Sequence, residues 1–231
     1  MKHINSAPCL IRQLGMSLIE LMVAMTAGLV LLIALAYFFL GSRQINRTHD
    51  DVSRMQESGR YALEILGKAI RQAGYRTDAD SPFSGVALTG ADGAKDTITV
   101  QYDPQEGGEA DCTGANVAAG TLVTYAFAVN GSRELTCNNV VVADNIEDMQ
   151  IAYGIDANKD GVIESYQAAG GVASFGQVAA VQVSLLVRGG TSNVAANGSQ
   201  TFTYNGAPTT RTDGFLRQVY TATYTVRNQA K

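Results

Sequence analysis

The sequence predicts an α+β fold in which one long N-terminal helix precedes a mostly antiparallel β-sheet domain. About 25 nearly unbroken apolar residues run from Met16 to Leu40. An amphipathic pattern with three- and four-residue steps follows, and no proline interrupts the chain between Met16 and Arg76. From Tyr75 onward the composition shifts to Gly, Thr, Asn, Asp and Val, arranged in short alternating segments. A helical pattern followed by a run of strands is typical of this class.

The apolar run is longer than the roughly 20 residues that cross a bilayer core, so it predicts one membrane-spanning helix. The short segment before it carries Lys2 and Arg12 and no acidic residue. The arginines that follow the run are offset by Asp50 and Asp51. The positive-inside rule therefore places the N-terminus in the cytoplasm and the C-terminal domain in the periplasm.

A stripe of apolar and small residues extends the helix beyond the membrane segment. Its members recur at helical spacing: Val52, Met55, Gly59, Ala62, Leu63, Leu66, Ile70 and Ala73. Gly74 suits a helix C-terminus, and Arg71 lies in the predicted last turn. A continuous helix from Met16 to Ala73 would measure about 87 Å at 1.5 Å per residue.

Segments of alternating or continuous apolar character predict the strands. They are Thr97–Tyr102, Leu122–Val129, Asn139–Ala143, Met149–Ile155, Val178–Arg188, Thr201–Tyr204 and Arg217–Arg227. In the last of these, Tyr220, Ala222, Tyr224 and Val226 share one face, and Thr221, Thr223 and Thr225 share the other. The dipeptide Asn130-Gly131 predicts a tight hairpin turn. Segments 78–95, 103–120 and 189–200 are rich in Gly, Asp and Asn and are expected to be loops.

Charge and cysteine content restrict the partners and the compartment. The formal charge of the 231 residues is −4; without the positive charges of Lys2 and Arg12 it becomes −6, so no direct nucleic-acid partner is expected. Cys112 and Cys137 form an even pair in the exported part, which favours a disulfide in an oxidising compartment. The alternative is two buried free thiols.

The residues needed for common catalytic sites are scarce, so we expect no enzyme. The chain has two histidines, His3 and His49, and neither has a Cys, Ser or carboxylate partner at a recognised spacing. Gly189-Gly190 follows no phosphate-loop pattern. No cofactor is required by this composition.

One acidic stretch, "GIDANKDGVIESYQ" at residues 154–167, is a candidate calcium loop. Asp156, Asn158 and Asp160 fall at positions 1, 3 and 5 of an EF-hand-type loop, and Gly161 follows at position 6. The remaining candidate ligands are the Val162 carbonyl at position 7 and Glu164, which would close a shorter loop because position 12 is Gln167. The flanks, Met149–Ile155 and Val162–Tyr166, look like strands. The alternative is a polar hairpin with Asp160-Gly161 in its turn.

The N-terminus fits three interpretations: a plain anchor, a cleaved secretory signal ending at Ala34-Leu35-Ala36, and a prepilin leader. A secretory signal has a shorter apolar core and no carboxylate inside it. The stretch "GMSLIE" at residues 15–20 resembles the prepilin signature of type IV pilins and type II secretion pseudopilins. The resemblance implies a pilin-like fold, cleavage between Gly15 and Met16 by prepilin peptidase, and N-methylation of Met16.

The same resemblance gives Glu20 a role in assembly. A charged side chain in the bilayer costs roughly 2.5–3.5 kcal/mol, so it needs a partner. In this family the proposed partner is the N-terminal amine of a neighbouring subunit, here that of Met16. The chain departs from the family pattern in having Met16 in place of the usual Phe, and in lacking the proline that major pilins often carry near Tyr37.

The stretch "ESGRYALEILGKAIRQAGYR" at residues 57–76 resembles PilW-type minor pilins, as do "AVQVSLLVRG" at 180–189 and "LRQVYTATYTVRN" at 216–228. The resemblance implies a non-catalytic subunit in the inner membrane and then in the pilus. Its expected partners are prepilin peptidase, other minor pilins and the major pilin, in a tip complex that primes assembly and supports motility, adhesion and DNA uptake. The alternatives are a J-type minor pseudopilin and an anchored periplasmic adhesin domain.

The expected organisation is a leader at 1–15, a transmembrane or filament-core half-helix at 16–40, an amphipathic half-helix at 41–75 and a periplasmic β-rich domain at 76–231.

Overall fold

The computed structural model describes residues 15–76, 83–104, 109–195 and 198–228. The chain divides into two compact units, residues 1–46 and 47–231. We call the second unit the head. Helix α1 (Leu18–Gln72) contributes to both units. Apart from Gly15, the predicted leader lies outside the described residues.

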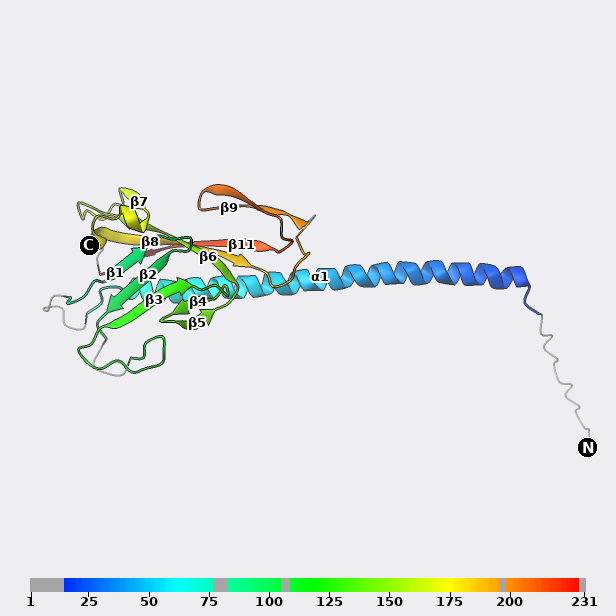
Figure 1. Cartoon of the computed structure of the whole chain (residues 1–231), viewed down its shortest axis with the longest axis horizontal. Coiled ribbons are helices and arrows are strands. Elements are labelled where there is room, and N and C mark those ends of the chain that lie inside the picture. The colour runs from blue at the N-terminus through cyan, green and yellow to red at the C-terminus, as the bar shows by residue number, and fades with distance from the viewer. Residues whose placement is uncertain (1–14, 77–82, 105–108, 196–197, 229–231) are drawn as a thin grey trace, which may run out of the picture. The chain divides into compact units, whose positions relative to one another are not determined.

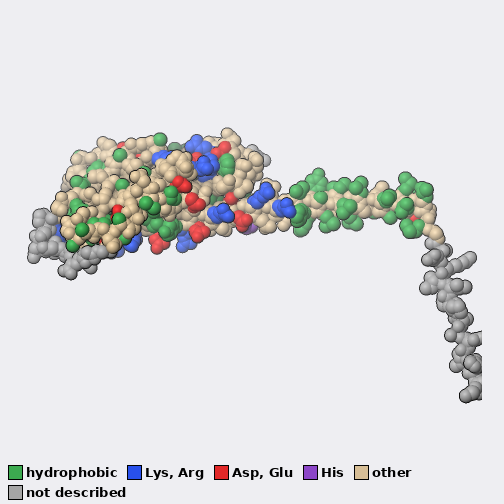
Figure 2. Space-filling view, turned by 60° about the horizontal axis from the view of Figure 1, so that its bottom comes forward, with side chains coloured by type: hydrophobic (Ala, Val, Ile, Leu, Met, Phe, Trp, Pro, Cys, Tyr) green, Lys and Arg blue, Asp and Glu red, His purple; other side chains and the backbone are tan. Residues whose placement is uncertain are grey.

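The described part of the first unit is mainly an apolar helix with almost every side chain exposed. Hydrophobic side chains dominate the visible face of this part of α1 (Figure 2). By length and composition, α1 is the one helix in the described ranges that could cross a membrane, and none of its most apolar window is buried. This exposure agrees with the predicted membrane anchor.

The head half of α1 buries the predicted stripe. Its buried residues are Asp51, Met55, Ser58, Gly59, Ala62, Leu66, Gly67, Ala69 and Ile70. The helix ends where Gly74 adopts a φ of +68°, a left-handed conformation that suits glycine. Asn228 Nδ2 donates to the Ala73 carbonyl at 2.9 Å, and Gly74 N donates to the Gln101 carbonyl at 2.9 Å. The chain's last described residue therefore caps α1.

Two antiparallel sheets, a hairpin and two 3₁₀ helices, η1 (Ala169–Gly171) and η2 (Phe175–Gln177), form the rest of the regular structure described in the head (Figure 1). The first sheet has the order β1-β2-β3-β4-β5: β1 (Leu88–Ala91), β2 (Thr97–Tyr102), β3 (Val123–Val129), β4 (Leu135–Cys137) and β5 (Val140–Ala143). The second has the order β11-β8-β6-β7: β11 (Arg217–Thr225), β8 (Val178–Arg188), β6 (Ile146–Ile155) and β7 (Ser165–Gln167). The hairpin is β9 (Gln200–Tyr204) with β10 (Ala207–Arg211).

One continuous core joins α1 to both sheets. Leu66 and Ile70 of α1, Phe127 of β3 and Leu185 of β8 are among its fully or almost fully buried members. The buried carboxylate of Asp96 ties the sheets together, because it accepts hydrogen bonds from Gly93 N at 3.0 Å and from Ile151 N of β6 at 2.8 Å. Every strand pair is antiparallel, so the predicted fold class is confirmed.

Each predicted strand is present, and the bounds of β2 and β8 match the prediction. Three short strands were not predicted: β1, which lies inside the expected loop 78–95, β4 and β10. The prediction of a tight turn at Asn130-Gly131 was wrong, because Val129 pairs with Leu135 and residues 130–134 form a longer loop. Asn130 Oδ1 accepts hydrogen bonds from Ser132 N and Glu134 N, which stabilises this wider loop.

Candidate functional site

The first candidate site is the segment from Gly15 to Glu20. Gly15, Met16 and Ser17 precede the helix, and Ser17 O accepts the first helical hydrogen bond from Leu21 N at 3.1 Å. A Cβ on Gly15 would meet no atom within 4 Å. The Gly15–Met16 peptide is therefore in exposed, non-helical backbone.

Glu20 lies in the first turn of α1, where a negative charge interacts favourably with the helix dipole. Its side chain is exposed, as are those of Ile19 and Leu21 on either side of it. Within the described ranges it has no ion pair and no hydrogen bond. The arrangement is an unpaired carboxylate on an apolar helix surface.

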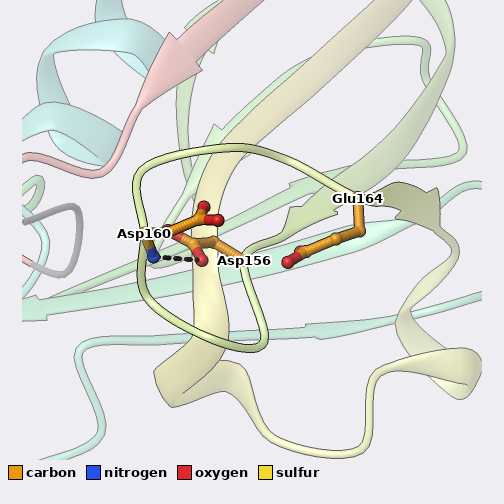
Figure 3. A group of neighbouring side chains, drawn as sticks. All are labelled: Asp156, Asp160 and Glu164. Carbon is orange, nitrogen blue, oxygen red and sulfur yellow. Dashed lines mark hydrogen bonds between the residues drawn. The ribbon is translucent and has the colours of Figure 1, made fainter.

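The second candidate site is the connection between β6 and β7, where Asp156, Asp160 and Glu164 lie together (Figure 3). One ligand atom from each of the three carboxylates lies within 4.8 Å of the other two. Asp156 is buried, whereas Asp160 and Glu164 are exposed. Three negative groups at this separation could share a cation that prefers oxygen ligands, such as Ca²⁺.

Backbone amides hold these carboxylates in place. Asp156 accepts hydrogen bonds from Asp160 N at 3.2 Å and from Gly161 N at 2.9 Å, as Figure 3 shows for the first. Glu164 accepts from Ala157 N at 3.0 Å. Gly161 has a φ of +88°, which explains the glycine at the position where the loop reverses.

The other predicted calcium ligands lie in the same connection. Asn158 Nδ2 donates to Asp160 Oδ2 at 3.0 Å, and Val162 N donates to Asp160 Oδ1 at 2.8 Å. The predicted strand Val162–Tyr166 was partly wrong, since β7 begins at Ser165, opposite Ile155. Asp160-Gly161 therefore lies in a wide connection rather than a two-residue turn.

The predicted disulfide is confirmed. Cys112 and Cys137 are bonded, with their Cα atoms 5.7 Å apart. Cys137 is fully buried on β4, and Cys112 lies in the segment between β2 and β3. The bridge therefore fixes this segment against the first sheet.

Two polar clusters of the head were missed by the sequence reasoning. Asp51, which served only in the charge count, is buried and accepts hydrogen bonds from Thr191 N and Thr191 Oγ1, both at 3.0 Å. Its position four residues before Met55 places it on the predicted buried stripe. That spacing was a usable signal.

The second missed cluster surrounds Arg217. Its guanidinium donates to both oxygens of Asp213, at 2.7 and 2.6 Å, and to Glu147 Oε2 at 2.9 Å. The hydrogen bonds from Arg217 hold the pKa of the Asp213 carboxyl well below its usual range, and raise the pKa of Arg217 itself. No local sequence pattern brings these three residues together.

A long apolar N-terminal helix combined with an antiparallel β-sheet head is the fold of a type IV pilin. The structure resembles a type IV-like pilin from Thermus thermophilus with a TM-score of 0.51 and 19% sequence identity, over 79% of this chain and 98% of that one. Residues 113–228, just over half of the 231, match the family described as type IV pilus-assembly protein W. The chain belongs to this family. No curated protein matches it in a comparison of sequences.

Proposed function

We propose that this chain is a minor pilin of the type IV pilus, anchored in the inner membrane by α1 with its head in the periplasm, and then incorporated into the pilus. Membership of the pilus-assembly protein W family carries this proposal. The exposed apolar helix supports it, because such a surface needs either lipid or the helices of other subunits to cover it. The subunit catalyses no reaction.

The proposed role is to prime pilus assembly in a complex with other minor pilins and the major pilin at the pilus tip. Motility, adhesion and DNA uptake would depend on it through the number of pili. The lack of a proline in the apolar half of α1, where major pilins often carry one, supports a minor rather than a major subunit.

Processing by prepilin peptidase would precede assembly. The peptidase would cut between Gly15 and Met16 and release residues 1–15, and the new amine of Met16 would be methylated. The exposed, non-helical backbone at Gly15 is compatible with entry into a protease site.

Glu20 would be paired in the assembled filament. Its own Met16 amine lies just before the same helix, so the amine of a staggered neighbouring subunit is the better geometric partner. This pairing offsets a cost of roughly 2.5–3.5 kcal/mol for the carboxylate in lipid. Glu20 would thus set the register between subunits.

The Gly15→Val substitution tests the processing step. A branched side chain at the cut should leave an uncleaved precursor in the inner membrane, whereas the wild-type chain should have an intact mass that lacks residues 1–15. Gly28→Val is the matched control, because Gly28 also has no atom within 4 Å of a Cβ but lies inside α1. Mature protein of normal mass from Gly15→Val would reject the cleavage assignment.

The system in which the chain works is tested by deleting its gene and collecting sheared pili. Loss of surface pili, with type II secretion unchanged, is the expected result. Normal pili with failed secretion would instead identify a J-type pseudopilin. Normal pili with normal secretion, and an uncleaved chain in the wild type, would identify an anchored adhesin.

A further inference from the structure

Three arginines lie together at the end of the head where the loop after β3, the turn before β6 and the end of β8 meet. Ile146 N donates to the Arg133 carbonyl at 2.9 Å, and Arg188 N donates to the Asn145 carbonyl at 2.9 Å. Arg133 and Arg188 are therefore hydrogen-bonded to the two sides of one peptide unit. Arg217 is adjacent to Arg188, since these two residues pair across β11 and β8.

The carboxylates of this cluster are used mainly by Arg217. Asp213 receives two of its hydrogen bonds, and Glu147 Oε2 receives a third at 2.9 Å. Arg188 reaches the same Glu147 oxygen only at 3.9 Å, and its buried Nε makes no hydrogen bond. Of the hydrogen bonds that Asp213 and Glu147 accept from arginines, all come from Arg217 and none from Arg188.

Arg133 has no side-chain hydrogen bond or ion pair in the part of the chain that the structure describes. The nearby carboxylates are engaged elsewhere: Glu134 accepts from Asn130 Nδ2 at 2.6 Å, and Asp144 accepts from Ser58 Oγ at 2.7 Å. Burial, followed by the positive charge of Arg133, lowers the pKa of Arg188. The two like charges are therefore close enough to repel each other.

The Arg188 side chain and the Arg133 backbone are held in position before any ligand arrives. Arg188 is on a central strand, and its guanidinium lies 4.0 Å from the centre of the Phe215 ring. Arg133 is fixed with a φ of +64° in the loop that Asn130 organises. Prior positioning reduces the entropy lost when a ligand binds.

We infer that Arg133 and Arg188 form a binding site for a single oxyanion, either a carboxylate or a phosphate group. Guanidinium forks match the geometry of both groups with paired hydrogen bonds. A bound anion would offset the repulsion between the two arginines. The ligand is either a free anion or an acidic side chain of another pilus subunit.

The test uses the full chain in detergent, titrated calorimetrically with sodium phosphate and sodium acetate at constant ionic strength and pH. We expect saturable binding of one anion per chain. Arg133→Gln should weaken the affinity at least tenfold, because Arg133 is exposed and its loss leaves the core intact. Arg188→Lys keeps a charge on the less exposed residue, removes the planar fork, and should weaken binding similarly.

Arg211→Gln is the matched control, since it removes one exposed arginine from β10. It should bind as the wild type does. Co-purification of pilus subunits from membranes separates the two sources of the anion: a loss in Arg133→Gln identifies a subunit carboxylate, and an unchanged complex identifies a free anion. The absence of saturable binding together with an unchanged complex would overturn the proposal, as would equal weakening by Arg211→Gln.

Discussion

Glycine and tyrosine fit together where α1 meets β11. A Cβ on Gly59 would overlap the Tyr220 ring, and one on Gly67 would overlap the Tyr224 ring. The two tyrosines can therefore lie directly against the helix backbone. Tyr224 also donates to the Leu63 carbonyl at 2.7 Å, whereas the buried Tyr220 hydroxyl makes no hydrogen bond.

This difference predicts opposite outcomes for one substitution made at two places. Tyr224→Phe loses a hydrogen bond and should destabilise the head by about 0.5–1.5 kcal/mol. Tyr220→Phe removes a buried hydroxyl without a partner, so it should be neutral or stabilising. Thermal melting measures the stability of the two variants, and each variant is the control for the other. Equal losses of stability in both variants would contradict the prediction.

The Arg217 cluster predicts a pH-dependent contribution to stability. The pKa of Asp213 is lowered in the folded state by hydrogen bonds from Arg217. A lowered folded pKa means that the contribution is fully present above the unfolded value of about 3.9 and is lost as pH falls through the folded pKa. Arg217→Gln should lower stability by on the order of 2 kcal/mol near pH 7.

The stability difference between wild type and Arg217→Gln should therefore narrow below about pH 4. Denaturant unfolding between pH 7 and pH 3 measures it, with Arg211→Gln as the exposed control. A stability difference between wild type and Arg217→Gln that stays constant across this pH range would show that Asp213 does not account for the contribution of Arg217.

At the scale of elements, the Asn-Gly dipeptides at residues 130–131 and 205–206 show what sequence can and cannot predict. Asn205 and Gly206 both have positive φ, and Tyr204 pairs with Ala207, so this pair forms the two-residue turn of the β9–β10 hairpin. The same dipeptide at residue 130 was expected to do so and does not. There the register of β3 and β4 and the Asn130 side-chain hydrogen bonds select a wider loop.

The length of the strands explains most of the other differences between the predicted and the observed strands. The strands β2 and β8 were predicted with their observed bounds because alternation or a long apolar run marked them. The strands that were missed, β1, β4 and β10, have three to five residues and form through pairing with partners elsewhere in the head. Such strands depend on tertiary context, which a local pattern does not contain.

The connection between β6 and β7 leads to a prediction for metal binding. We expect millimolar Ca²⁺ to raise the melting temperature of the chain in detergent, relative to EGTA, because Asp156, Asp160 and Glu164 offer oxygen ligands to one ion. Binding to the folded state alone stabilises by about 2.7 kcal/mol at a hundredfold excess over Kd.

Asp156→Asn combined with Asp160→Asn should remove the effect of Ca²⁺. Asp50→Asn, which changes an exposed carboxylate of α1, should preserve it. The same melting temperature for the wild type in Ca²⁺ and in EGTA would leave the connection as a polar loop without a metal.

At the scale of the whole molecule, the fold class and the family were predictable because the features that define them are local. The apolar run, the amphipathic stripe and the two C-terminal strands are each continuous in sequence. The clusters of Asp51 with Thr191 and of Arg217 with Glu147 join residues 140 and 70 positions apart. Such pairs arise only from the tertiary fold.

Glu20 tests the assembly mechanism of the whole subunit. Glu20→Leu should leave cleavage and membrane insertion intact, but it should reduce both co-purification with other pilins and the yield of sheared pili. The reason is that the carboxylate is expected to pair with an amine of a neighbouring subunit. Glu20→Asp should be intermediate, because its side chain is one methylene shorter.

Thr26→Leu is the control, since Thr26 is also polar but its hydroxyl donates to the Val23 carbonyl at 2.9 Å of its own helix. It should assemble normally. Wild-type assembly of Glu20→Leu would show that the carboxylate does not set the register between subunits.

The tyrosines of β11 also impose an order on biosynthesis. The ribosome makes α1 first and β11 last, and the hydrogen bond from Tyr224 to Leu63 spans 161 positions. Throughout most of translation, Gly59 and Gly67 therefore lack the two tyrosine rings that pack against them in the folded head. A nascent chain that stops before Arg217 contains every other strand of the head but lacks β11, the strand whose tyrosines pack on α1. The core is thus completed only when the final segment is released.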